Sequence, residues 1–468
     1  MVSGIQRVLL SRRGLLKGAT AAAVALSVPA LAPGIRRVAE AAAGAVTLNV
    51  WASPDNADAL ADIANRFTVQ NPAIRVTVTP ISWEVLYPRM LADVASGTGA
   101  FDVATWDVQT AGAVSKGFVD LGAFRTAHPD LVDPSYDLKD FDPGVWHVGG
   151  VWQGKNIGIP FYNNTMLLYY RKDYFGDTKL QSAFQAKYNR PLAVPKTWKE
   201  AVSVSEFFTK SKNPSSPTSY GMALMFPRTH TLFYMYVLYF ADYRRDPAGI
   251  RKWGPVDLDY GDFFSSQHTP AFGTPEGVAA IKDMMTLMPF SPDPLGSDYG
   301  ETIEYFTKGT VAMVPQWTGV WASFKTAQVL QPLGDKVGTA VMPGGHSCSG
   351  IWGLGINRAT KQPNEAFKFL QWATNKDNDK TKFMKFGVAP SRISSLKDPA
   401  VLQADPRVPA LLATYPQQGY RPRIPVEPKL EDITLGTFSE VLGGRRPATV
   451  ATLSGLAGDW TSIIKSGA

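Results

Sequence analysis

Hydrophobic and polar residues follow a repeating strand–helix order along residues 46–106. Alternating positions predict strands at 46–51 and 74–78, and an apolar run predicts a third strand at 101–106. Between them, apolar residues at helical spacing predict helices over 57–69 and 83–95. This order is typical of a parallel sheet covered by helices, in which ligands bind beyond the carboxyl ends of the strands.

That rule selects the loops Trp51–Asp55, Ser82–Glu84 and Trp106–Gln109 as candidate ligand contacts. Aromatic rings and carboxylates lie side by side in all three, and both groups suit the apolar faces and hydroxyl rims of a sugar. The candidate binding residues from these loops are Trp51, Asp55, Trp83, Glu84 and Asp107.

An aromatic, amide-rich turn precedes the apolar run Met166–Tyr170. Tyr162, Asn163 and Asn164 stand at the entrance of this predicted strand, where stacking faces and amide groups again suit a sugar. Further along the chain, four more aromatic candidates stand at or near the ends of predicted strands. They are Phe226, His230, Trp317 and Trp352.

Several motifs, in this order, resemble those of the extracellular solute-binding proteins of carbohydrate ABC importers, in their maltose-binding-protein-like branch. The resemblance covers nearly all of 46–468. The motifs that carry it are Thr47–Trp51, Phe101–Val103 with Gly117–Leu121, the crossover segment Gly154–Phe175, the helix start Pro195–Glu200, Tyr305–Met313 with Gln316–Trp321, Gly350–Asn357, and the hinge-like Gly387–Arg392.

The resemblance implies an α/β, two-lobed periplasmic-binding-protein fold of type II with discontinuous lobes joined by hinge segments. The expected lobes are 46–163 with 343–388, and 164–342 with 389–468. In the family, acidic residues after the first and third strands bond sugar hydroxyls, and these positions correspond to Asp55 and Asp107. The family's stacking aromatic corresponds to Trp317, and Arg392 of the hinge-like segment joins the candidate binding residues.

The function implied is that of a periplasmic substrate-binding protein that captures a sugar or related polyol in an interlobe cleft. Such a protein is a monomer without catalytic activity or cofactor, and it delivers its ligand to ABC transporter permease subunits in the inner membrane.

The first 45 residues read as an export signal rather than as part of the fold. Ser11–Lys17 resembles a twin-arginine motif, and the apolar stretch Gly18–Ala32 is shorter than the roughly twenty residues that span a bilayer. We therefore expect export through the twin-arginine machinery and removal of 1–45. Of the formal charge of +7, residues 1–43 carry +5, so bulk charge gives a nucleic-acid partner no support.

Cys348 is the only cysteine of the chain. An intramolecular disulfide is thus impossible, and no cysteine near the cleavage region is available for a lipid anchor. An exported protein without a lipid fits a Gram-negative periplasm, so we expect a soluble protein there.

Signatures of common enzymes are missing from the sequence. The glycine pattern that binds dinucleotides is incomplete, and the one that binds phosphates is absent. The five histidines lack metal-ligand spacing, so we expect neither cofactor nor metal. Two alternatives stay open. An exported carbohydrate-active hydrolase needs only two carboxylates, for which Asp55, Glu84, Asp107 and Glu304 qualify. A different solute, such as a polyamine or phosphorylated polyol, is the other.

Overall fold

The computed structural model describes residues 46–244, 257–321, 324 and 333–467 of the chain. The expected signal peptide, 1–45, lies outside the described residues. From Val46 onward the chain forms one compact unit.

The first elements of this unit follow the strand–helix order that the sequence predicts. They are β1 (Val46–Ala52), α2 (Pro54–Gln70), β2 (Ile74–Pro80), α3 (Trp83–Ser96) and β3 (Val103–Asp107). Strand β1 pairs in parallel with β2 and with β3, so the predicted parallel sheet is confirmed here. Strand β3 begins two residues later than predicted and ends on Asp107, which is therefore the last residue of the strand.

Beyond β3 the sheet is mixed rather than parallel. Its strand order is β2-β1-β3-β10-β6-β8-β7, with β11 (Gln418–Gly419) beside β10 and β9 (Val337–Ala340) beside β6. Strand β10 (Ser347–Ile356) runs antiparallel to both β3 and β6 (Ile159–Arg171). The prediction of a parallel sheet covers 46–106 only, and no direction is predicted for these later strands, because an apolar run predicts a buried strand but not its direction.

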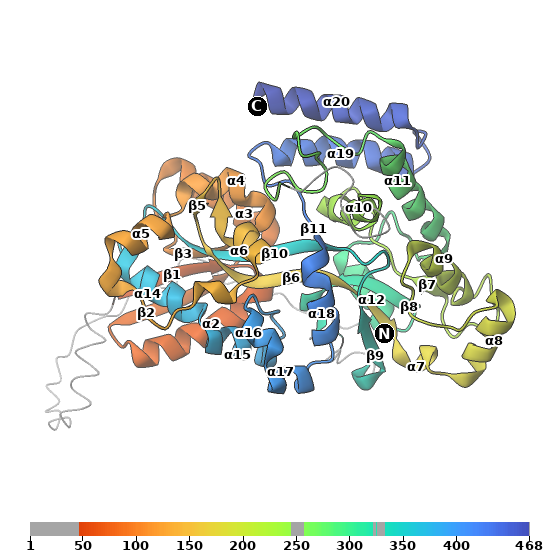
Figure 1. The fold of residues 1–468 in the computed structure, drawn as a ribbon, viewed down its shortest axis with the longest axis horizontal. Helices are drawn as coiled ribbons and strands as arrows, with labels where there is room; N and C mark the ends of the chain where they lie inside the picture. The colour runs from red at the N-terminus through yellow and green to blue at the C-terminus, as the bar shows by residue number, and fades with distance from the viewer. Residues whose placement is uncertain (1–45, 245–256, 322–323, 325–332, 468) are drawn as a thin grey trace, which may run out of the picture. The chain divides into compact units, whose positions relative to one another are not determined.

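Strand β6 connects the two parts of the sheet. Its first half pairs with β10 as far as Thr165, and its second half, from Met166, pairs with β8 (Val311–Trp317) and β9. Figure 1 shows this strand running from the helices labelled α2, α3, α5 and α14 to those labelled α7 to α12. The apolar run predicted at Met166–Tyr170 is thus confirmed as part of a fully buried strand.

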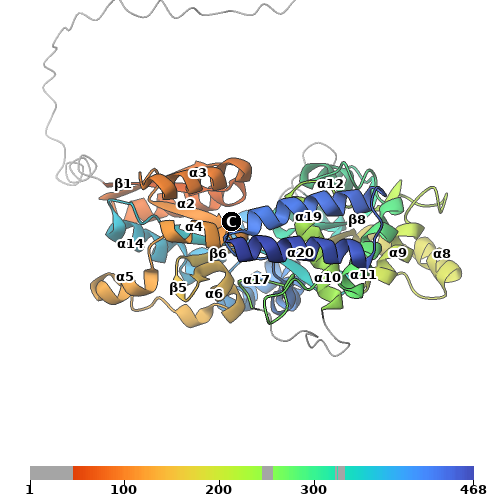
Figure 2. The same ribbon diagram turned by 90° about the horizontal axis from the view of Figure 1, so that it is seen from above.

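Helices cover both parts of the sheet, as expected of a two-lobed α/β fold of the periplasmic-binding type (Figure 2). Strand β7 (Tyr220–Met222) ends the main order beside β8, and β4 (Val151–Trp152) and β5 (Lys155–Asn156) form a separate two-stranded sheet. The remaining described helices are α4 (Ala111–Val114), α5 (Leu121–Ala127), α6 (Pro143–Gly150), α7 (Lys172–Phe175), α8 (Thr178–Tyr188), α9 (Trp198–Phe207), α10 (His230–Tyr243), α11 (Pro275–Leu287), α12 (Tyr299–Thr307), α14 (Pro363–Ala373), α15 (Lys376–Phe386), α16 (Ile393–Lys397), α17 (Pro399–Ala404), α18 (Val408–Thr414), α19 (Glu427–Leu442) and α20 (Val450–Ser466).

The start of α9 shows how local sequence sets an element. The hydroxyl of Thr197 accepts a hydrogen bond from the backbone N–H of Glu200 at 3.1 Å, and the Glu200 carboxylate accepts one from the backbone N–H of Lys196 at 2.7 Å. The predicted helix start is confirmed. Trp198 is 3% exposed and stacks on Tyr239 with ring centroids 3.9 Å apart, which is a packing role.

Candidate functional site

The sheet register brings three of the predicted site residues into one row. Trp352 on β10 stands directly opposite Asp107 on β3 and opposite Tyr162 on β6. Trp317 closes β8 and stands opposite Met166 on the same strand β6. The row of Asp107, Trp352 and Tyr162 thus puts residues far apart in sequence next to one another, and Trp317 stands further along β6, in the second part of the sheet.

A second contact joins Asp55 to this row through Gly319. A Cβ placed on Gly319 would lie 2.7 Å from the hydroxyl of Tyr162 and 3.8 Å from Oδ2 of Asp55. Burial, and after it the charge of Asp55, raise the pKa of both Tyr162 and Tyr299. We call these four residues, Asp55, Tyr162, Tyr299 and Gly319, the Asp55 group.

Asp55 is exposed to solvent, yet the surrounding protein desolvates its carboxylate and raises its pKa. Both observations hold together if the side chain lies in a recess that solvent can enter. The structure gives this carboxylate neither a hydrogen bond nor an ion pair with any described residue. The Tyr162 hydroxyl is buried and lies next to Thr318. A polar ligand would therefore meet one acceptor, the Asp55 carboxylate, that no described residue occupies.

Aromatic rings surround the same part of the sheet. Trp317 is 8% exposed and packs over Gly350, where a Cβ would lie 2.5 Å from its Cζ3 atom. Its ring meets that of Tyr234 edge to face, with centroids 5.0 Å apart. The side-chain carbonyl of Asn164 accepts a hydrogen bond from the hydroxyl of Thr318 at 2.7 Å. The wall beyond the Asp55 group is thus aromatic with a few polar groups, as in sites for polyhydroxylated ligands.

Asp107, the second predicted acidic residue, has a different environment. It is 8% exposed, and its Oδ1 lies 3.2 Å from Nη2 of Arg421. Arg421 also donates to the side-chain oxygen of Gln109, and its Nη1 lies 2.7 Å from Nε2 of His230. We call these residues, with Glu427 and Glu431 of α19, the Arg421 cluster. Asp107 is paired with a cation and is therefore not free in the way that Asp55 is, although Nε of Arg421 and one carboxylate oxygen of Glu427 are buried without a partner among the described residues.

The contact with Arg421 fixes the tautomer of His230. A guanidinium can only donate, so Nε2 of His230 must accept and carries no proton. Nδ1 then carries the proton and donates to the Glu431 carboxylate, 2.8 Å away. The neutral imidazole stacks on Trp83 of α3, with centroids 5.2 Å apart and planes 10° from parallel. This stack joins the first turn of α10 to the first turn of α3, at the two sides of the predicted cleft.

Little space is left between these residues. A cavity of about 10 Å³ is lined by Trp83, Trp106, Asp107 and Trp352 among others, which is room for about one water. Wider surface hollows, such as one of about 450 Å³ beside Trp198 and Asp242, lie outside both groups. A sugar ring does not fit the small cavity, so solute entry on this side requires the walls to move apart.

Three other predicted residues, Trp51, Phe226 and Asn163, are engaged in packing or in other contacts. The Trp51 ring packs against Phe101 at 4.9 Å, and Phe226 is fully buried with its ring against Tyr239. The side-chain oxygen of Asn163 accepts from Gln418 at 3.3 Å, while its amide nitrogen is buried without a partner among the described residues. Glu84 lies in the first turn of α3, and its side chain lies outside the described part.

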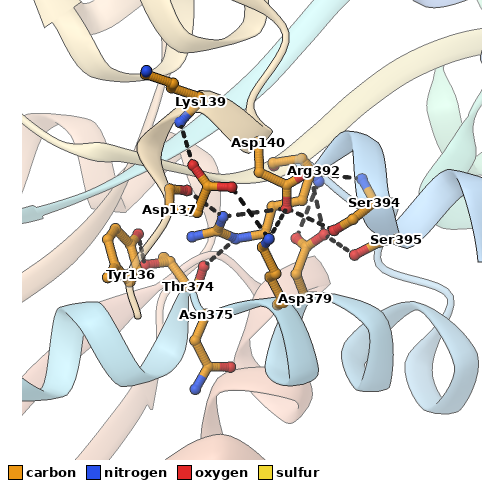
Figure 3. A network of polar contacts seen from close by, with 12 residues as sticks. Tyr136, Asp137, Lys139, Asp140, Thr374, Asn375, Asp379, Arg392, Ser394 and Ser395 are labelled. Carbon is orange, nitrogen blue, oxygen red and sulfur yellow. Dashed lines mark hydrogen bonds and ion pairs between the residues drawn. The ribbon is translucent and has the colours of Figure 1, made fainter. Parts of the chain in front are cut away.

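Arg392 is the hub of a separate polar network (Figure 3). It is 1% exposed; Nε donates to the carbonyl of Thr374 and Nη1 to that of Asp137, both at 2.7 Å. Nη1 also lies 3.4 Å from the Asp140 carboxylate. The backbone N–H of Arg392 donates to Asp379, which also accepts from Ser395. The structure thus does not bring Arg392 to the Asp55 group; it fastens the hinge-like segment to α14 and α15.

Sequence reasoning missed Arg421, Glu427, Glu431, Tyr234 and Tyr299. Arg421 lies between Tyr420 and Arg423 in a stretch without helical or strand periodicity, so no pattern marked it. Tyr299 begins α12 behind the capping residue Asp298, and that helix start was the one signal available. Glu304, a candidate for hydrolysis, lies on the outer surface of the same helix and pairs with Lys308.

The described residues hold neither a metal centre nor a membrane span. No group of three or more histidine, cysteine or carboxylate side chains there is arranged to hold a metal ion. In the same residues we found no helix with the length and apolar character needed to traverse a bilayer.

Comparison with known sequences gives the chain its family. The family of the bacterial extracellular solute-binding protein matches residues 53–380. A probable amino-acid ABC transporter periplasmic-binding protein of Sinorhizobium fredii is 25% identical over 389 residues, which cover 82% of this chain and 80% of the relative. The mannitol-binding protein of Pseudomonas aeruginosa is 25% identical over 388 residues, 78% of each chain.

Solved structures share the fold. Maltose-bound MalE3 of T. maritima has a TM-score of 0.72 at 21% identity, with 90% of this chain and 100% of that one covered. A solute-binding protein of Agrobacterium vitis with bound D-mannitol has a TM-score of 0.68 at 22% identity, with 90% and 99% covered. Together with the family match over most of the chain, these findings show that the protein belongs to the bacterial extracellular solute-binding proteins.

Proposed function

We propose that this protein is the periplasmic, non-catalytic binding component of an ABC importer and that it captures a sugar or a related polyol. The observation that carries the proposal is the Asp55 carboxylate, which is exposed and makes no hydrogen bond or ion pair with the described residues, close to the buried hydroxyl of Tyr162. A carboxylate accepts hydrogen bonds from neighbouring hydroxyls, and bonds to a charged group are worth about 1.5–3 kcal/mol each. Several similar proteins are named for, or solved with, mannitol, maltose or ribitol, which supports a sugar or polyol as the solute.

The mode of action that we infer is closure of two lobes around the solute. The expected lobes, 46–163 with 343–388 and 164–342 with 389–468, are supported by the change of β6 partners between Thr165 and Met166. The segment after β11 returns to the first lobe, since the backbone N–H of Gly112 donates to the carbonyl of Arg423 at 2.9 Å. The stack of Trp83 on His230, present in this structure, would form on closure and separate on opening. The permease would bind the closed form.

Calorimetry with purified mature protein tests the solute class. The panel holds maltose, D-tagatose, D-mannitol, ribitol and a set of amino acids, because one relative is named as an amino-acid transporter component. We expect heat of binding with a sugar or polyol, and a loss of about tenfold or more in affinity for Asp55→Asn. The matched control is Asp459→Asn, the same change at an exposed aspartate on α20, which should leave affinity unchanged. Binding of amino acids alone would overturn the sugar class.

The hydrolase alternative is tested with the same protein. Long incubation with maltose, the one member of the panel with a glycosidic bond, followed by product analysis, should return the sugar intact. Turnover that Asp55→Asn abolishes while affinity stays near normal would establish the enzyme instead.

Export is tested by replacing both Arg12 and Arg13 with Lys. We propose that the twin-arginine machinery exports the protein as a folded monomer, so the double variant should stay in the cytoplasm. Normal periplasmic levels of this variant would contradict that route.

A further inference from the structure

The charge around the Asp55 group restricts the kind of solute. The Asp55 carboxylate makes no ion pair with the described residues, and its neighbours Tyr162 and Tyr299 are uncharged phenols. Desolvation without a compensating cation raises the free energy of the carboxylate form. A solute that brings a positive charge or a hydrogen-bond donor to this point relieves that cost, and one that brings a negative charge increases it.

Two buried cations of the described residues, Arg407 and Arg421, are already paired with carboxylates. The guanidinium of Arg407 donates to the carbonyl of Thr318 at 2.8 Å, next to Gly319, but its Nη2 pairs with Asp405 at 2.6 Å. That side chain is fully buried. Arg421 pairs with Asp107 at 3.2 Å. To pair with either of these two described cations, an anionic solute would have to break a buried ion pair, which is costly because the released carboxylate would stay buried.

The aromatic rings around the Asp55 group also favour a positively charged solute. Phenol and indole rings attract an ammonium through their electron-rich faces, and the attraction grows when water is excluded. Tyr162, Tyr299, Tyr234 and Trp317 all belong to this wall. A carboxylate surrounded by such rings provides both the charge and the stacking surface that an amino-bearing sugar or polyol needs.

We propose that the solute presents a hydrogen-bond donor without negative charge to Asp55, and that amino-substituted sugars or polyols bind more tightly than their neutral parents. Uronic and aldonic acids of the same skeleton bind most weakly. This inference rests on the proposed function and narrows it: the site takes neutral and cationic polyhydroxylated solutes and rejects acidic and phosphorylated ones.

Two matched series of probes test this order of affinity, from the amino compound through the neutral one to the acid. The first is D-glucose, D-glucosamine and D-glucuronate, and the second is D-glucitol, 1-amino-1-deoxy-D-glucitol and D-gluconate. Affinities are measured by calorimetry at pH 7 and at two salt concentrations. In at least one series we expect the amino member to bind about tenfold more tightly than the neutral one, and the acid at least tenfold more weakly. Added salt should narrow these differences.

The variant Asp55→Asn keeps the shape of the side chain and removes its charge. It should bring the three members of a series to within about threefold of one another, while Asp459→Asn should preserve the wild-type order. An acid member that binds wild-type protein as tightly as its neutral parent would overturn the inference and leave the sugar-binding proposal standing. An unchanged order in Asp55→Asn would overturn it as well. Failure of every member and of the wider sugar panel would instead remove the proposed function itself.

Discussion

Oδ1 of Asp107 and Nη2 of Arg421 lie 3.2 Å apart, in an ion pair that joins the end of β3 to the segment after β11. Both side chains are buried. Asp107 thus holds the guanidinium that in turn contacts Gln109 and His230, and any effect of Asp107 on solute binding should pass through Arg421.

We predict that Asp107→Ala destabilises the protein by on the order of 3–5 kcal/mol, because it leaves a guanidinium buried without its counter-charge. Asp107→Asn should cost less, since the amide oxygen still accepts a hydrogen bond. Urea unfolding measures both. In a double-mutant cycle with Arg421→Met, the two single effects should be strongly non-additive. If Asp107→Ala kept wild-type stability and lost only affinity, Asp107 would be a direct solute ligand.

The sequence pattern was sufficient for the elements from β1 to β3, because their periodicity is local and each strand or helix is long. It also placed Asp55 correctly just past the first strand, since the end of an alternating run marks the end of a strand. The contrast between Asp55 and Asp107 could not be predicted. Arg421 is 314 residues away from Asp107, and no local rule connects them. The antiparallel direction of β10 was missed for a similar reason, as pairing depends on distant partners.

A methyl group at Gly350 should displace the Trp317 ring without touching the solute directly. The added Cβ would lie 2.5 Å from Cζ3 and 2.9 Å from Cη2 of Trp317, closer than such atoms approach. We predict that Gly350→Ala weakens solute binding by on the order of 1 kcal/mol, about fivefold, from lost stacking. Calorimetry with the solute that binds in the panel measures this. Gly300→Ala on α12, where the Cβ would meet nothing within 4 Å, should leave affinity unchanged. Equal affinity in both variants would show that the ring does not stack on the solute.

Glu427 should make stability fall as the pH rises. Burial first, and then the neighbouring Glu431, raise the pKa of Glu427 well above its usual value of 4.5. The folded protein therefore holds a proton that the unfolded chain releases above that value. Stability is fully present below pH 4.5 and is lost as the pH rises towards the raised pKa. We predict that Glu427→Gln loses less stability as the pH rises, because its amide stays neutral and donates as the protonated carboxyl does.

Urea unfolding of wild type and Glu427→Gln at several pH values between 5 and 8 measures this difference. The free energy of unfolding of the variant should change less with pH than that of wild type. Parallel curves for the two proteins would mean that Glu427 is ionised in the folded state. Glu440→Gln, at a partly exposed position on the same helix where the carboxylate pairs with Arg446, is the control and should follow the pH dependence of wild type.

Arg392 should contribute to folding and not to solute contact. Its guanidinium contacts Thr374, Asp137 and Asp140, and it stacks over Phe141 with 4.3 Å between its carbon and the ring centre. Arg392→Ala would remove the nearer cation from the largely buried Asp140 and leave Lys376 at 4.0 Å, so we predict a loss of on the order of 3 kcal/mol in the free energy of unfolding. Arg75→Ala, at an exposed position on β2, should change stability by less than about 0.5 kcal/mol. Affinity, measured on the fraction of Arg392→Ala that is folded at low temperature, should stay within about threefold of wild type. The opposite pattern, wild-type unfolding with affinity reduced tenfold or more, would return Arg392 to the binding site and would require the hinge-like segment to move on binding.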